Sequence, residues 1–132
     1  MKFKHEKDKK LFLDLHPMLL RIMFHMNYWC FARKLPFVVT STLSTKQEDI
    51  ALKRTSTSHK TGRAFDIAIR ELSWTTDDLD NFKIDFEKLY GKFGAVSKRD
   101  LVRRLVVIKN NHIHVQIGWE FVNFKTFEYL RG

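Results

Sequence analysis

Two segments of the sequence carry histidine and aspartate where a β-strand would present one polar face. In Ala64-Phe65-Asp66-Ile67-Ala68-Ile69, large apolar residues alternate with alanines and with Asp66, which is typical of a strand. His112 and His114 share one face of a second expected strand. Because burying such groups without partners costs free energy, the pattern favours groups that pair with each other or bind a metal.

His59 precedes the first of these strands and completes a set of three. Gly62, between His59 and the strand, would let the backbone turn sharply. A histidine, an aspartate and one histidine of the His112-Ile113-His114 pair suit zinc and leave one position open, which is typical of a catalytic zinc site. The alternative is that the histidines bind no metal, since paired and surface histidines are common.

The elements that must position these groups are predicted from the spacing of the apolar residues. Steps of three and four residues predict a helix from about His16 to Lys34, with Pro17 in its first turn. Thr75 begins a second helix, with acids in its first turn, that runs to Gly91 or Gly94. Four strands, a short helix and a tail helix complete the pattern: Phe37–Val39, Ala64–Ile69, Leu105–Ile108 and Ile113–Ile117, then Gln47–Leu52, then Phe121–Leu130.

The predicted class is therefore α+β, with a small and mostly antiparallel sheet. An N-terminal helix and a crossing helix pack on that sheet, and the zinc site lies at the sheet face. The length of 132 residues fits one domain over residues 1–132, of which residues 1–10 are charged and expected to be flexible.

Composition limits the ligands and partners. The single cysteine, Cys30, excludes an internal disulfide and a thiolate-rich zinc site, so a bound metal must take histidine and carboxylate ligands. A net charge of +9 favours a polyanionic partner such as an anionic cell wall. Nucleic-acid binding would rest on this charge alone, because no nucleic-acid motif is present.

The sequence has no run that predicts a membrane span and no recognisable signal peptide. We therefore expect synthesis in the cytoplasm and no membrane partner. If the protein acts outside the cell, another component must release it.

The run Ser58-His59-Lys60-Thr61-Gly62-Arg63-Ala64-Phe65-Asp66 resembles the histidine motif of the zinc D-alanyl-D-alanine carboxypeptidases, a family that includes the phage L-alanyl-D-glutamate peptidases and shares its fold with the hedgehog signalling domain. Four fixed residues of that motif, His59, Gly62, Ala64 and Asp66, stand at its spacing. His112-Ile113-His114-Val115 resembles the closing motif of the family, and the resemblance spans roughly residues 11 to 120.

This resemblance implies a zinc peptidase that cleaves peptidoglycan stem peptides, with His59, Asp66 and His114 as zinc ligands. His112 would lie beside the metal and steady an oxyanion. The implied setting is an endolysin released during phage lysis or a virion component, and we expect a monomer.

The resemblance fails at the general base, which in the family is an acid three residues before the last ligand or two residues after it. Here those positions hold Asn111 and Gln116, and neither amide takes up a proton at neutral pH. The Thr-Ser turn that precedes the family's arginine continues here without one. Three explanations compete: a carboxylate from elsewhere, with Glu120, Glu71 and Glu48 as candidates in that order; His112 acting as the base; or a zinc-binding cell-wall or virion module without hydrolysis.

Overall fold

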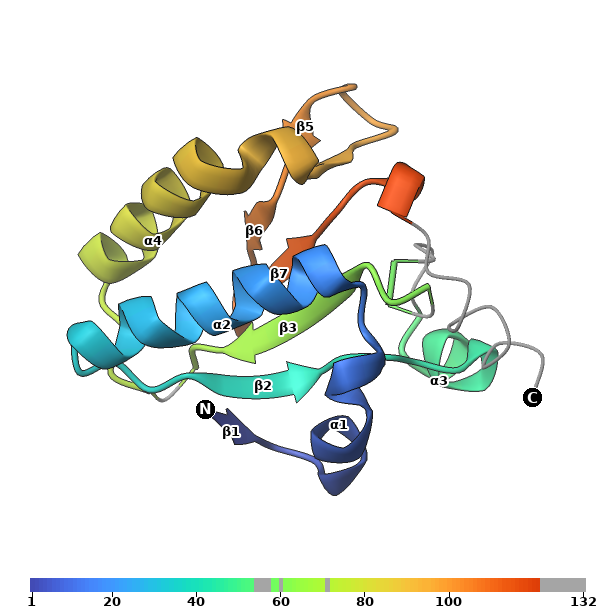
Figure 1. The fold of residues 1–132 in the computed structure, drawn as a ribbon, viewed down its shortest axis with the longest axis horizontal. Coiled ribbons are helices and arrows are strands. Elements are labelled where there is room, and N and C mark those ends of the chain that lie inside the picture. The colour runs from blue at the N-terminus through green and yellow to red at the C-terminus, as the bar shows by residue number, and fades with distance from the viewer. Residues whose placement is uncertain (54–57, 60, 71, 122–132) are drawn as a thin grey trace.

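The computed structural model describes residues 1–53, 58–59, 61–70 and 72–121. Its centre is a mixed five-stranded sheet in the order β1-β2-β3-β7-β6 (Figure 1). β1 runs parallel to β2, and the other three pairings are antiparallel. The strands of this sheet are β1 (Lys2–Phe3), β2 (Val38–Ser41), β3 (Ala64–Ala68), β6 (Val106–Ile108) and β7 (His112–Gln116), and a separate pair consists of β4 (Ala95–Val96) and β5 (Arg103–Arg104).

Local sequence signals set the ends of the helices. His16 caps the long helix by accepting a hydrogen bond from the backbone nitrogen of Met18, and Pro17 occupies its first turn. Thr45 and Thr75 each begin a helix through a reciprocal capping box. Among the described residues, the α-helices are α1 (Glu6–Leu11), α2 (Pro17–Ala32), α3 (Lys46–Ala51) and α4 (Thr76–Tyr90), and 3₁₀ turns cover Phe12–Asp14, Gly91–Phe93 and Trp119–Phe121.

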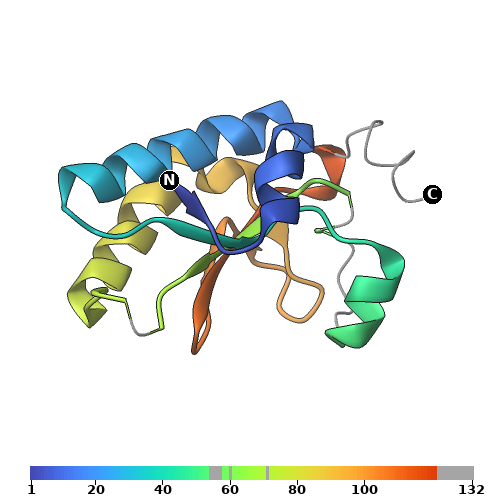
Figure 2. The ribbon, with the colours of Figure 1, turned by 90° about the horizontal axis from the view of Figure 1, so that it is seen from below.

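The core lies between one face of the sheet and the helices α2 and α4. Figures 1 and 2 show these two helices together over the sheet, with α3 set apart from them beyond the end of β2. Trp29 of α2 packs edge-on against Phe82 and Phe86 of α4, with ring centroids 5.3 and 6.2 Å apart. The apolar side chains of β3 and β7, such as Ile67 and Ile113, are fully buried against them. The polar side chains of those strands therefore lie on the opposite face of the sheet.

The predicted α+β class with a mostly antiparallel sheet is confirmed, as are the long N-terminal helix and the crossing helix. Cys30 is buried in α2, and this burial raises the pKa of its thiol to about 12. Within the described residues, no helix is long and apolar enough to cross a membrane. Of the expected tail helix, only Phe121 belongs to the described part of the chain.

Residues 1–10, which we expected to be flexible, carry regular structure. Lys2 and Phe3 form β1 beside β2, and α1 follows directly. Asp8 of α1 is buried, and its Oδ1 accepts hydrogen bonds from the backbone nitrogen and hydroxyl of Thr42, at 2.9 and 2.6 Å. The first helix is thus tied to the end of β2 by a buried carboxylate.

Candidate metal centre

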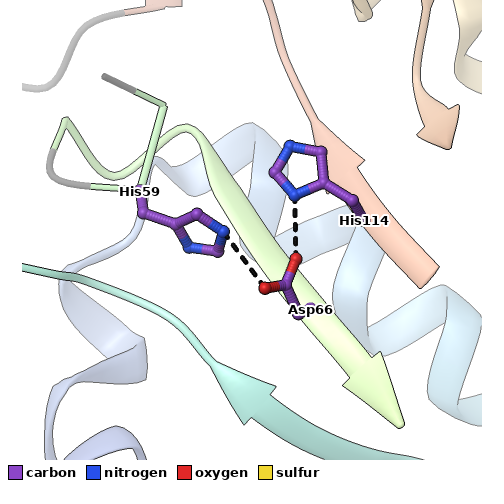
Figure 3. A group of neighbouring side chains, drawn as sticks. All are labelled: His59, Asp66 and His114. Carbon is purple, nitrogen blue, oxygen red and sulfur yellow. Dashed lines mark hydrogen bonds and ion pairs between the residues drawn. The ribbon is translucent and has the colours of Figure 1, made fainter. Parts of the chain in front are cut away.

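Two neighbouring strands and the turn before them bring three donor side chains together. β3 and β7 pair in a register that places Asp66 opposite His114. His59 lies in the turn before β3, where Gly62 has a φ of 70°, in the left-handed region that favours glycine. Figure 3 shows the three side chains pointing toward one another from these separate parts of the chain.

The ligand atoms of this His-Asp-His group lie close enough together to bind one ion. Nδ1 of His114 lies 2.8 Å from Oδ1 of Asp66, and Nε2 of His59 lies 3.3 Å from Oδ2 of Asp66 (Figure 3). One ligand atom from each residue lies within 4.8 Å of the other two, so the group could hold a metal ion. His59 and Asp66 are buried, and the His114 side chain is only 12% exposed.

The backbone of β2 orients His59. A register shift between Val39 and Ser41 places Ser41 opposite Asp66 and brings the following residue, Thr42, beside the site. Nδ1 of His59 donates to the carbonyl oxygen of Thr42 at 2.8 Å, because a carbonyl oxygen can only accept. In a neutral ring this leaves the lone pair on Nε2, which faces Asp66.

This arrangement fits a cation between the imidazoles and the carboxylate. A lone pair on Nε2 of His59 would repel Oδ2 of Asp66 unless a proton or a metal ion lay between them. His114 presents the same problem, because its Nδ1 faces Asp66 and its Nε2 lies 3.0 Å from the side-chain oxygen of Gln116. Neutral imidazole nitrogens and a carboxylate are ligands that zinc accepts.

Without a metal, protons on the two imidazoles would balance Asp66, and its carboxyl is anionic in that state as well. Burial alone would raise the pKa of its carboxyl, but hydrogen bonds from His114 and His59, and their positive charge, outweigh that effect. The pKa of Asp66 is therefore held below its ordinary range, and the group is an anionic donor at neutral pH.

His112 lies beside the group rather than within it. Its Nε2 is 4.0 Å from Oδ1 of Asp66, and its side chain is 27% exposed. Burial lowers the pKa of His112, so the ring is neutral at pH 7. Nδ1 of His112 lies 2.6 Å from the side-chain oxygen of Asn111 and donates to it, which leaves the lone pair on Nε2.

The candidate acids do not join the three donors in the part of the chain that the structure describes. Glu120 pairs with Arg103 at 3.1 Å, and its side chain is 53% exposed. Glu48 caps α3 and pairs with Lys7. Burial would raise the pKa of the Glu48 carboxyl, but the contact with Lys7 outweighs burial and holds that pKa below its ordinary value. Glu71 lies outside the described residues.

A groove opens beside Asp66 on the face of the sheet that carries the site. Its volume is about 810 Å³, and its lining comes from α1, the end of β2, α3, β3 and the start of β7. Ser41, Asp66 and His112 all contribute to it, so a ligand in the groove would lie against Asp66, the member of the His-Asp-His group that lines it.

The structure brings together the three predicted ligands and places His112 beside them, whereas Glu120 and Glu48 pair elsewhere. Sequence reasoning missed Asp8 and Thr42, which hold His59 in place; the polar run after β2 was the only signal for Thr42. Comparisons with known protein families, with curated proteins and with solved structures found no significant match.

Proposed function

We propose that this protein is a zinc-dependent peptidase that cleaves peptidoglycan stem peptides. The observation that carries the proposal is the convergence of His59, Asp66 and His114, whose positions also follow the motif spacing of the zinc carboxypeptidases. The open groove beside Asp66 supports it, since a peptide needs access to the metal. The net charge of +9 would help the protein stay on an anionic cell wall.

Each residue of the group has a defined part in this proposal. Nε2 of His59, a carboxylate oxygen of Asp66 and Nδ1 of His114 would hold Zn²⁺, and the carbonyl of Thr42 fixes the His59 ring for that purpose. When bound, Zn²⁺ would supply a water of lowered pKa and polarise the scissile carbonyl.

His112 is our candidate for the proton acceptor. The Nδ1 of His112 donates a hydrogen bond to Asn111, so Nε2 carries the lone pair that can accept a proton. This Nε2 is the nitrogen that lies 4.0 Å from Asp66. Asn111 thus replaces the acid that the resemblance led us to expect and orients a base instead. Glu120 remains a weaker candidate, because reaching the site would require it to leave Arg103.

A second function is a zinc-binding cell-wall or virion module without hydrolysis. The observation that favours it is the pair of amides, Asn111 and Gln116, at the positions where the resemblance predicts an acid. Both functions use the same zinc ligands, so they differ only in the proton-transfer step.

Cleavage of isolated peptidoglycan separates the two functions. Zinc-loaded protein should release stem-peptide fragments, and a chelator should abolish the release. His112→Gln should keep stoichiometric zinc and lose about 100-fold or more in rate, a range typical of losing a general base. Stoichiometric zinc without any chelator-sensitive cleavage would exclude the peptidase and leave the binding module.

A further inference from the structure

The groove continues from Asp66 along the line of β3. Asp66 and Ala68 lie on one face of β3, and both line the groove together with Arg70, which follows the strand. Ala68 is small, so the floor between its two neighbours stays open. Arg70 lies in a turn two residues beyond the end of β3, so its Cα is at most about 14 Å from the Cα of Asp66.

The end of the groove beyond His112 carries two cations. A second cavity of about 600 Å³ shares Arg70, Asn111 and His112 with the groove, and Lys109 also lines it. Within the described part of the chain, no carboxylate pairs with Arg70 or with Lys109, whereas Lys7 at another wall of the groove is paired with Glu48.

We propose that Arg70, assisted by Lys109, binds a carboxylate of the substrate and makes the groove selective for acidic peptides. A guanidinium can bind a carboxylate through two parallel hydrogen bonds, which fixes orientation as well as charge. Asn111, which lines both cavities, adds polar surface at the same end. The inference rests on the proposed peptidase function, because it assigns Arg70 to substrate peptides lying in the groove.

Stem peptides of peptidoglycan contain glutamate and end in alanine, so they carry free carboxylates. Successive residues of an extended peptide are separated by at most about 3.6 Å, so the distance from Asp66 to Arg70 spans at most about four residues of a bound peptide. The carboxylate bound by Arg70 would therefore belong to a residue near the scissile bond rather than to the next stem peptide. Arg70 is a specificity residue in this scheme and takes no part in the chemical step.

The test compares a soluble stem peptide with the same peptide whose carboxylates are converted to amides. Affinity is measured by titration calorimetry on the zinc-loaded protein, and KM is measured as well if the peptide is cleaved. Arg70→Gln should weaken binding of the acidic peptide by about tenfold and leave binding of the amide unchanged, since only a charge-assisted contact is lost. Arg70→Lys should recover part of the affinity, because it keeps the charge but not the paired geometry.

Arg99→Gln is the matched control, because it removes the same charge from an exposed turn that does not line the groove. It should leave both affinities unchanged. Lys4 is another cation that lines the groove. Equal affinity of the unaltered protein for acid and amide would overturn the inference, as would loss of affinity in Lys4→Gln but not in Arg70→Gln. If the protein binds the acidic peptide through Arg70 but does not cleave it, the selectivity stands and only the catalytic function fails.

Discussion

Asp66 is the residue on which the proposed metal centre depends. Its two carboxylate oxygens face imidazole nitrogens of different histidines, at 2.8 and 3.3 Å, and the residue is only 6% exposed. A buried carboxylate between two imidazoles is stable only with protons or a metal ion to balance the lone pairs. Substitutions at this group therefore separate metal binding from simple pairing of side chains.

Loss of any one ligand should remove zinc. His59→Ala, Asp66→Asn and His114→Ala should each weaken zinc binding by more than about 100-fold, which exceeds the usual effect of altering a residue that only supports a ligand. His112→Ala is the control and should keep one zinc per chain, since it lies outside the group. Metal content after dialysis checks both results. Full zinc in His114→Ala together with loss in His112→Ala would exchange their assigned roles.

The proposed metal centre also depends on elements that carry no ligand. α1 and the end of β2 are joined by Asp8, and the carbonyl of Thr42 in turn orients His59. Asp8 therefore supports His59 indirectly, because both side chains are hydrogen-bonded to Thr42. A helix that we expected to be part of a flexible end belongs to the support of the site.

Asp8→Ala should weaken both the fold and the metal centre. It leaves the buried donors of Thr42 without the carboxylate, so unfolding free energy should fall by about 3 kcal/mol. Zinc affinity should fall by about tenfold, because the His59 ring loses its fixed support. Urea unfolding of the metal-free protein and competition with a zinc indicator measure the two effects. Glu6→Ala, an exposed acid of the same helix, is the control, and an equal effect from it would contradict the connection.

The donor set was predictable because it follows from local patterns. Two-residue alternation placed Asp66 on the polar face of one strand and both His112 and His114 on the polar face of another, and His59 stands in a short turn before the first strand. The choice of His114 over His112 came from the family resemblance. The support from Asp8 was not predictable, because its partner Thr42 lies 34 residues away in the sequence. The register shift in β2 depends on tertiary pairing in the same way, and it decides which carbonyl meets His59.

At the scale of the whole molecule, the metal would join segments that are far apart in the sequence. Asp66 and His114 belong to adjacent strands but are separated by 48 residues. α4 and the β4–β5 pair lie between them in the chain. A metal bound to both strands and to the turn before β3 therefore reinforces long-range contacts in the native state that the unfolded chain lacks.

Zinc should therefore raise the melting temperature of the protein. With free zinc at 100 times its Kd, binding to the native state alone contributes about 2.7 kcal/mol. For a chain of this length that corresponds to a rise of about 10 °C in Tm, measured by thermal unfolding monitored by circular dichroism. Magnesium at the same concentration should leave Tm unchanged, because it prefers six oxygen ligands over imidazole nitrogen. His114→Ala should show no zinc-dependent rise, and a rise equal to that of the unaltered protein would mean that zinc stabilises the fold from a different site.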